Sequence, residues 1–538
     1  MSRAPRPCLI AVGAVLVAAV AVAACDAGNG ILHHRRDPGA LMVAQPADIS
    51  GLDLARLVDS ESIEVGEILF EGLVRWRSGT TEIEPGLATS WQVSPDGLHW
   101  TFELRPGVTF HDGQRLDADA VVFSFLRVID PHHPNYLGDA DAKYWHLLLK
   151  DVTRVGALGA SRIEITVARP YAPLLGELAM FPIVSPAAVR QWGMAFDRHP
   201  IGSGPFEFES WSPGEQVVVK RFDHYWGPAP KLERIVFRVV PDARQRLVDL
   251  QSGSVDLATA ILPDEESFVD LHPDLTLLHA PNNDVSYLAM NTRHPPFTDR
   301  RVRRAINHAI NKIPMVKLAY QGHAIPADGP LPPSQWGYHA PRTQYAYDPA
   351  LARKLLAEAA ADGAFDGTKI YKLYASITPR GYLSQPERVA RYLQAALAQI
   401  GVRTELILQP LRAQFASTSA GEHDLALAGW ISDTGDPDNL LYVLLHSDNA
   451  VQGAAQNLAF YSSPAFDKLV IDAQTAADTP TRIARYAEAQ EVVADDAPWV
   501  PLAHSELVVA ARADLAGVTL SPLGHAVYPW IYRRSEQR

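Results

Sequence analysis

The sequence predicts an α/β protein built from several domains, and three observations lead to this prediction. The chain has 538 residues, more than one hydrophobic core usually supports, so roughly two to four domains are expected. Its composition, 47% hydrophobic and 20% charged, is that of an ordinary globular protein. A strand-like alternation near residue 100 is followed by segments that alternate helical and strand patterns, which favours α/β domains over an all-β sandwich.

The clearest strand pattern follows a turn formed by Pro95, Asp96 and Gly97. Apolar and polar side chains alternate from residue 98 to residue 104, which predicts a strand with one buried face. Asp117 is placed to cap a following helix, whose apolar face is formed by Val121, Val122, Phe125 and Leu126.

Three later helices are marked by the residues at their ends. Thr298 or Asp299 caps the first, Asp348 caps the second before Pro349, and Gly401 ends the third, which is followed by a strand at 402–409. The first helix carries Arg300, Arg301, Arg303 and Arg304. We expect these arginines to form a solvated basic face rather than a phosphate site.

The N-terminus has the pattern of a secretory signal. Arg3 and Arg6 precede a wholly apolar run over 8–24, and the small residues before Cys25 look like a bacterial lipobox. We therefore expect a signal peptide over 1–24 and a lipidated N-terminus and tether over 25–41, with a plain membrane anchor as the alternative. Asp26 resembles the signal that keeps Gram-negative lipoproteins at the inner membrane.

Cysteine content and charge exclude several classes of site. The chain has two cysteines, Cys8 and Cys25, so the mature chain can hold no internal disulfide and no Cys-ligated metal. The net charge of -13 argues against nucleic-acid binding. His132 and His133 lack a third ligand nearby in sequence and are expected in a surface loop. No cofactor or metal is implied, and no phosphate loop, HExxH or GxSxG motif is present, although a site assembled from distant segments stays open.

The loop AGWISDTGDPDN, residues 428–439, concentrates three acids. Their spacing fits neither frame of an EF-hand calcium loop, and a catalytic pair of acids stays possible. Asp436 and Asp438 are explained by a turn at Pro437 and by capping a helix that begins near Asn439. Asp433 is not explained in this way.

Several stretches in one fixed order resemble a known family. They are LFEGLVRW at 69–76, LATSWQVSPDGLHWTFELRPGVTFHDGQRLDADAVVFSF at 87–125, PIGSGPFEFESW at 200–211, FDHYWG at 222–227, LQSGSVDLA at 250–258, YLAMNTRHPPFTDRRVRRAINHAINK at 287–312 and the 428–439 loop. Together they resemble the extracytoplasmic solute-binding proteins of family 5, the oligopeptide- and dipeptide-binding class of ABC importers.

The resemblance implies a periplasmic-binding-protein-like fold of class II, in which two α/β lobes are joined by a hinge and an extra domain is inserted beside the first lobe. Carried onto this chain, the first lobe is expected at 42–72, 182–284 and 505–538. The extra domain is expected at 73–181 and the second lobe at 285–504.

In peptide-binding members of this family, an Asp three residues after a Trp binds the α-ammonium group of the ligand. The resemblance assigns this role to Asp433, with Trp430 offering apolar surface and the backbone of Gly429 and Ile431 pairing with the peptide as an added strand.

Arg380, with Tyr382 two residues on, resembles the cation that binds the other end of a dipeptide. A surface arginine near a helix start is the alternative for Arg380. Members that bind longer peptides carry an Arg where this chain has Leu427, which favours short ligands held at both ends or a ligand with no carboxylate there.

The function implied is the capture of short peptides outside the inner membrane and their delivery to an ABC permease with its ATPase subunits. The protein is expected to be a periplasmic, lipid-anchored monomer and not an enzyme. A non-peptide ligand (a nickel complex, haem, glutathione, an opine or an oligosaccharide) is the alternative within the class. An envelope enzyme acting on peptides or glycans is the alternative from another class, and a sensory receptor is a further one.

Overall fold

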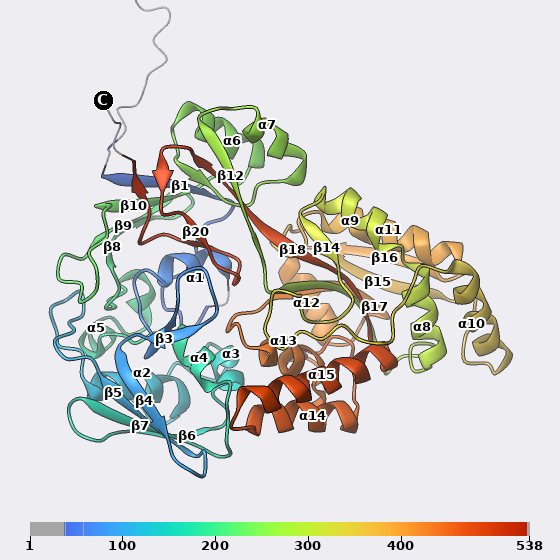
Figure 1. The fold of residues 1–538 in the computed structure, drawn as a ribbon, viewed down its shortest axis with the longest axis horizontal. Helices are drawn as coiled ribbons and strands as arrows, with labels where there is room; N and C mark the ends of the chain where they lie inside the picture. Colours follow the sequence, from blue (N-terminus) through green and yellow to red (C-terminus); the bar gives the residue numbers. More distant parts are fainter. Residues whose placement is uncertain (1–36, 38, 58, 535–538) are drawn as a thin grey trace, which may run out of the picture.

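The computed structural model describes residues 37, 39–57 and 59–534. The predicted signal peptide over 1–24 and the predicted lipidation site Cys25 lie outside these residues. Ala40 and Leu41, which we assigned to the tether, are the first residues of a strand. The molecule has two halves, and a continuous path of strands passes through both (Figure 1).

The first half is built on a sheet in which strand β1 lies at the centre. β1 pairs in parallel with β10 and β11, and β9 and β8 follow β10 in antiparallel order. Its strands are β1 (Ala40–Gln45), β8 (Phe206–Ser212), β9 (Gln216–Arg221), β10 (Arg234–Val239), β11 (Leu257–Ala258) and β12 (Leu275–Pro281). Its helices are α1 (Ser60–Gly66), α5 (Pro186–Trp192), α6 (Ala243–Ser252) and α7 (Glu266–Asp270). Short pairs β19 (Leu515–Ala516) with β22 (Tyr532–Arg533) and β20 (Thr519–Leu520) with β21 (Ala526–Val527) complete it near the C-terminus.

A separate antiparallel sheet packs beside this half, in the order β4-β5-β7-β6. The predicted strand is β5, where Trp100, Phe102 and Leu104 are buried and the residues between them are not. The predicted helix is α2, and Asp117 caps it by accepting a hydrogen bond from Ala120 N at 3.1 Å. The elements of this region are β2 (Val74–Trp76), β3 (Ile83–Pro85), β4 (Ala88–Val93), β5 (His99–Leu104), α2 (Ala118–Ile129), α3 (Lys143–Leu148), β6 (Val152–Ala157), β7 (Arg162–Val167) and α4 (Leu174–Met180).

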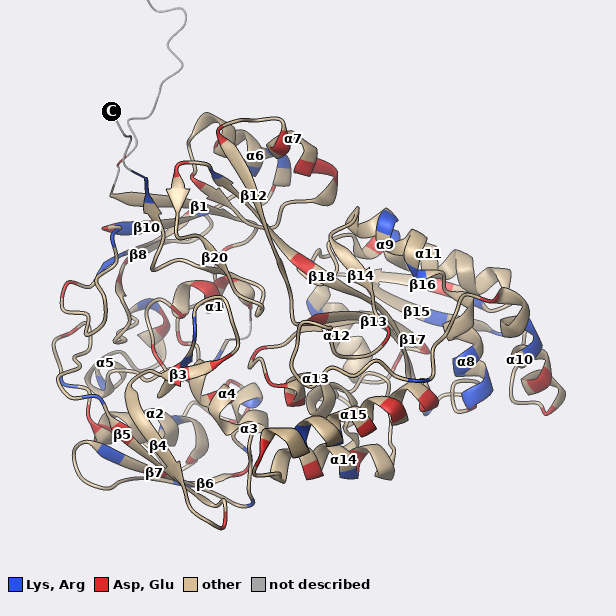
Figure 2. Ribbon diagram, viewed as in Figure 1, with Lys and Arg blue, Asp and Glu red and all other residues tan. Residues whose placement is uncertain are grey.

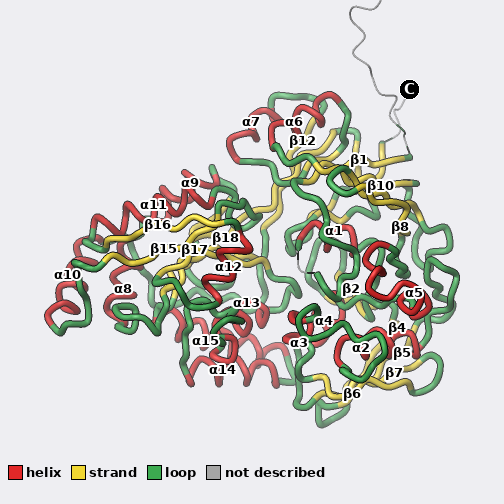
Figure 3. Tube along the Cα trace, turned by 180° about the vertical axis from the view of Figure 1, so that it is seen from behind, coloured by secondary structure: helices red, strands yellow, loops and turns green. Residues whose placement is uncertain are grey.

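The second half has a sheet whose two faces are both covered by helices (Figure 3). Alternate residues of β13 enter two cores: Leu288 and Met290 pack with α8 to α11, and Val285 and Tyr287 pack with α13 to α15. Its strands are β13 (Asp284–Met290), β14 (Ala324–Pro326), β15 (Ile370–Ser376), β16 (Arg403–Gln409) and β17 (Leu425–Ile431). Its helices are α8 (Arg300–Ala309), α9 (Lys312–Tyr320), α10 (Pro349–Ala361), α11 (Pro386–Gln399), α12 (Leu411–Ser419), α13 (Pro437–Leu445), α14 (Pro464–Thr475) and α15 (Thr479–Asp496).

The capping predictions for this half are confirmed, and the prediction for the arginines of α8 is wrong for one of them. Asp299 and Asp348 cap α8 and α10, and Gly401 follows α11 with a φ of 87°. Figure 2 shows the basic residues of α8, and Arg300, Arg301 and Arg304 are exposed or partly exposed as predicted, whereas Arg303 is not. Arg303 is buried and donates to the carbonyl oxygens of Asp496 and Phe297, because α8 packs beside the end of α15 and the guanidinium caps its free carbonyls.

Strand β18 (Trp499–Arg512) joins the halves. Residues 499–503 pair with β13, and residues 506–512 pair with β12. The short link between β12 and β13 also passes from one half to the other, beside β18.

In the part of the chain that the structure describes, no helix is both long and apolar enough to cross a bilayer.

Candidate binding cleft

A cavity of about 770 Å³ lies between the two halves. One wall comes from α1 and α3, and the other comes from β17, α12 and the loops around residues 376–383 and 448–458. The six residues that the sequence singled out all line this cavity: Arg380, Tyr382, Gly429, Trp430, Ile431 and Asp433. The volume is within the range of small-molecule sites, roughly 300–1,000 Å³.

The loop that carries Asp433 is fixed by the side chain of Asn439. The amide oxygen of Asn439 accepts from the backbone N–H of Asp433 at 3.0 Å and from Trp430 Nε1 at 3.1 Å. The same amide donates to the hydroxyl of Tyr144 at 3.2 Å. Asn439 therefore sets the positions of Asp433 and Trp430 together.

The neighbouring acids have structural roles. Asp436 caps α13, which begins at Pro437 rather than near Asn439, by accepting from Asp438 N at 3.0 Å. Its carboxylate also pairs with Arg482 at 2.8 Å. Asp438 lies in the first turn of α13 and does not cap it, because its side chain turns away to accept from Gln474 Nε2 at 2.9 Å.

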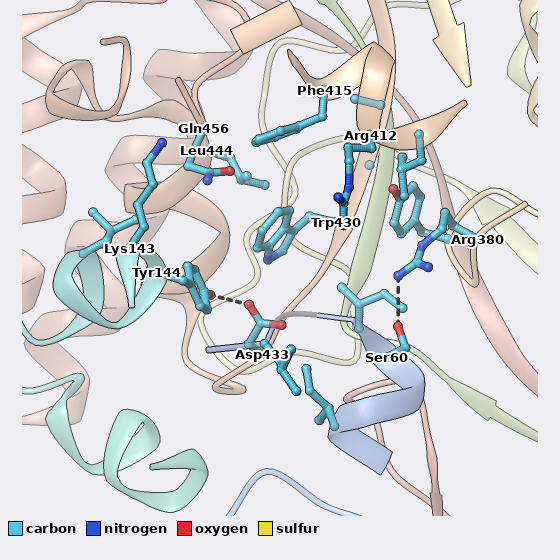
Figure 4. A pocket seen from close by; sticks show the side chains of 18 of the residues that line it. Ser60, Lys143, Tyr144, Arg380, Arg412, Phe415, Trp430, Asp433, Leu444 and Gln456 are labelled. Atoms are coloured by element: carbon cyan, nitrogen blue, oxygen red, sulfur yellow. Dashed lines mark hydrogen bonds between the residues drawn. The ribbon is translucent and has the colours of Figure 1, made fainter. Parts of the chain in front are cut away.

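Asp433 points into the cavity and is hydrogen-bonded by the phenol of Tyr144 on α3 (Figure 4). Burial raises the pKa of the Asp433 carboxyl to about 6, although hydrogen bonds from Tyr144, Trp430 and Asn439 oppose the rise. Among the described residues, none forms an ion pair with Asp433. The cavity wall thus holds a half-buried carboxylate without a cation.

Residues 427–431 of β17 have one edge free of strand partners in the described chain. β13 pairs along the whole of β17, whereas β15 pairs only with Leu425 and Ala426. The carbonyl of Leu427 faces away from β13, since it accepts from Gln414 Nε2 at 2.8 Å, while Ser432 N donates to Asn283 O on the β13 side. Because backbone groups alternate in direction along a strand, those of Gly429 and Ile431 face the free edge.

Tyr382 and Gly429 are in close contact. A Cβ on Gly429 would lie 2.3 Å from Cδ2 of the Tyr382 ring and 2.7 Å from the carbonyl oxygen of Val285. Only glycine therefore lets the Tyr382 ring pack against β17. Burial raises the pKa of Tyr382, so its phenol is neutral. Ile431 fills the space beside Gly524, where a Cβ would lie 2.9 Å from Ile431 Cδ1.

Arg380 reaches across the cavity. Its guanidinium donates to Ser60 Oγ on α1 at 2.9 Å, and its backbone is held by paired hydrogen bonds with Leu383 (Figure 4). Arg412 on α12 is exposed and lines the same cavity. Neither arginine has an ion-pair partner among the residues that the structure describes.

Sequence reasoning missed several residues of the wall. Tyr144 and Ser60 hold predicted residues but come from segments without a motif of their own. Asn439 belongs to the 428–439 loop, but its role in holding Asp433 and Trp430 was not predicted. Glu64 of α1 and Glu67, which directly follows this helix, also line the cavity, and burial raises the pKa of Glu64 to about 8. The three-residue spacing of Glu61, Glu64 and Glu67 was the one available signal for an acidic helix face.

Comparison with known proteins identifies the family of the chain. The family model described as "Bacterial extracellular solute-binding proteins, family 5 Middle" matches residues 82–452. The chain belongs to this family.

Di/tripeptide-binding protein 2 of Pseudomonas aeruginosa (strain UCBPP-PA14) is 34% identical over 504 residues, covering 90% of this chain and 93% of that protein. Heme-binding protein A of Haemophilus influenzae (strain ATCC 51907 / DSM 11121 / KW20 / Rd) is 32% identical over 499 residues, covering 89% of each chain. The solved structure of the ABC transporter-associated periplasmic binding protein DppA from Helicobacter pylori, in complex with peptide STSA, superposes with a TM-score of 0.82 at 33% identity, covering 92% of this chain and 98% of that one. The family resemblance and its α/β fold, both predicted from the sequence, are confirmed.

Proposed function

We propose that this protein is the substrate-binding component of an ABC importer and that it captures short peptides between its two halves. The observation that carries the proposal is Asp433, a half-buried carboxylate without a cation, beside the free edge of β17. An α-ammonium group supplies the missing cation through a charge-assisted hydrogen bond in a site of low dielectric. The names of the di/tripeptide-binding relative and of the peptide complex support the same ligand class.

Other residues that line the cavity are suited to bind the main chain, the carboxylate and the side chains of a peptide. The free backbone groups of Gly429 and Ile431 are suited to pair with an extended main chain, which recognises a peptide without reading its side chains. Arg380 and Arg412 are suited to a terminal carboxylate. Trp430 and the exposed Phe415 offer apolar surface to side chains.

Delivery follows from the organisation proposed for the chain: a first lobe (42–72, 182–284, 505–538), an extra domain (73–181) and a second lobe (285–504). Because the links between the lobes are the β12–β13 connection and β18, rotation about these two segments opens and closes the cleft. The closed monomer then presents its ligand to a permease with ATPase subunits. We assign it to the periplasmic face of the inner membrane, anchored through lipid on Cys25 after removal of 1–24.

Native mass spectrometry of the mature chain tests the ligand class first. Extra masses that match peptides of two to five residues support the proposal, whereas a single non-peptide mass supports the alternative ligands, haem among them. Turnover of a fluorogenic peptide library would instead indicate an enzyme.

Asp433→Ala tests the site. Peptide affinity is expected to fall by at least about a hundredfold, since a charged hydrogen-bond partner is lost from a buried site. Asp448→Ala is the matched control, because Asp448 lines the same cavity but is largely exposed. Full affinity in Asp433→Ala would overturn the assignment.

A further inference from the structure

Three side chains gather where β18 passes from one half to the other. They are His279 on β12, Glu506 on β18 and His323 in the turn between α9 and β14. One possible ligand atom of each lies within 4.8 Å of the others. The three side chains are partly exposed, so ions in solvent can reach them.

The distances from Glu506 to the two histidines are near those between two ligands of a tetrahedral metal site. One oxygen of Glu506 lies 3.3 Å from His323 Nδ1 and 3.8 Å from His279 Nδ1. Two ligands that share a zinc ion at bond lengths near 2.1 Å are about 3.4 Å apart. The imidazole rings of His279 and His323 are stacked, with centroids 4.6 Å apart and planes inclined by 10°. The Nδ1 atoms of both rings approach the same carboxylate oxygen of Glu506.

A second carboxylate sets the tautomer of His323. Glu266 on α7 contacts His323 Nε2, while Nδ1 faces Glu506. A neutral imidazole carries one proton, so a hydrogen bond to Glu266 leaves the Nδ1 lone pair directed at a carboxylate oxygen. A metal ion between Nδ1 and that oxygen would bind to both lone pairs. A carboxylate behind a ligating histidine is the usual outer partner of a metal site.

The electrostatics of the cluster favour a cation. Glu266 and Glu506 both face His323, and Asp270 adds a further negative charge close to Glu266 and His279.

We propose that His279, His323 and Glu506 form a binding site for Zn²⁺ or a similar borderline divalent cation, with Glu266 as the outer partner of His323. The set of two imidazoles and one carboxylate suits such ions better than Ca²⁺ or Mg²⁺, which prefer oxygen ligands. A metal here ties the two halves together at their crossing, because His323 lies beside α9 in the second half and His279 belongs to β12 in the first. The site is separate from the peptide cleft, since none of its residues lines that cavity.

Zn²⁺ titration of the mature, metal-free chain tests the site. The expected result is one Zn²⁺ bound per chain, at least tenfold weaker binding in His279→Ala and His323→Ala, and about tenfold or more weaker binding in Glu266→Gln. His132→Ala, which removes an exposed histidine elsewhere, and the double variant His33→Ala/His34→Ala are expected to bind as the wild type does. Absence of stoichiometric binding, or binding that survives in His279→Ala and His323→Ala, overturns the proposal.

A second measurement separates the site from the peptide cleft. Zn²⁺ is expected to raise the melting temperature of the wild type but not of His323→Ala, because a ligand stabilises only the state that binds it. Peptide affinity in metal-free buffer is expected to be unchanged in His323→Ala. A melting temperature that rises equally in both proteins would show that the Zn²⁺ binds elsewhere.

Discussion

The phenol of Tyr144 donates a hydrogen bond to the carboxylate of Asp433, although the two residues are 289 positions apart in the chain. Burial, and next the charge of Asp433, raise the pKa of Tyr144 well above its ordinary value, so the phenol remains a neutral donor. The region around α3 thereby completes the environment of an acid on the opposite side of the cleft. The electrostatics of the proposed ammonium site depend on both halves being in contact.

Tyr144→Phe is expected to weaken peptide binding by about tenfold at pH 7, because it removes one hydrogen bond to a charged group. Without this donor the pKa of Asp433 rises further, so the defect is expected to shrink above pH 8, where the carboxyl ionises in both proteins. Isothermal titration at several pH values measures both effects. Tyr136→Phe is the control, since its hydroxyl contacts Asp139 instead. A defect that does not vary with pH would contradict this explanation.

Peptide affinity is expected to fall as the pH is lowered through about 6, because protonation of Asp433 removes the charge that binds the ammonium. Between pH 7 and pH 5 the ionised fraction of a group with this pKa falls about tenfold, and the association constant should fall by the same factor. Asp433→Asn is expected to show weak binding at both pH values. A wild-type affinity that is flat from pH 7 to pH 5 would argue against Asp433 as the ammonium partner.

The same carboxyl has an opposite effect on stability. Its folded-state pKa lies above the value of about 4 in unfolded chains, so its favourable contribution is complete below pH 4 and is lost as the pH rises through 6. Asp433→Asn is therefore expected to match the wild type near pH 4 and to exceed its unfolding free energy by on the order of 1 kcal/mol at pH 7, after allowance for partial exposure. Urea denaturation of the ligand-free proteins at the two pH values measures this difference. Lower stability of Asp433→Asn at pH 7 would contradict it.

Local sequence patterns were sufficient to predict several helices and strands and part of the cleft. The alternation over 98–104 and the capping residues Asp117 and Asp348 act within a few positions, so the sequence shows them directly. Asp433 was singled out because the turn around Pro437 did not account for it.

What the sequence could not predict depends on contacts between distant segments. Arg303 was expected in solvent, because nothing near it in sequence indicates that the end of α15 packs over it. Tyr144 and Ser60 reach the cleft only after the halves come together. His279, His323 and Glu506 lie on three separate segments, so a search for ligand spacing along the chain does not find them.

Arg380→Gln is expected to weaken binding of peptides with a free C-terminal carboxylate by roughly tenfold to a hundredfold, as expected for loss of a charged partner. The same peptides with an amidated C-terminus should bind the variant and the wild type equally well. Arg412→Gln is the comparison, because Arg412 lines the same cavity from α12 but is more exposed. A larger loss of peptide affinity in Arg412→Gln than in Arg380→Gln would show that Arg412, not Arg380, binds the carboxylate.

Gly429→Ala is expected to lower the unfolding free energy by about 1–3 kcal/mol and to weaken peptide binding as well. The new methyl group meets the Tyr382 ring at 2.3 Å and the backbone carbonyl of Val285 at 2.7 Å. Since Val285 is fixed by its pairing in β13, the Tyr382 ring has to move, and the cavity is the open space beside it.

Denaturant unfolding and peptide titration of Gly429→Ala measure the two effects separately. Gly156→Ala on β6 is the matched control, because its Cβ would meet nothing closer than 3.7 Å. Peptide at a saturating concentration should restore only part of the lost stability, since the displaced Tyr382 ring competes with the ligand for the same volume. Full wild-type affinity in a destabilised Gly429→Ala would show that the Tyr382 ring can leave β17 without entering the peptide site.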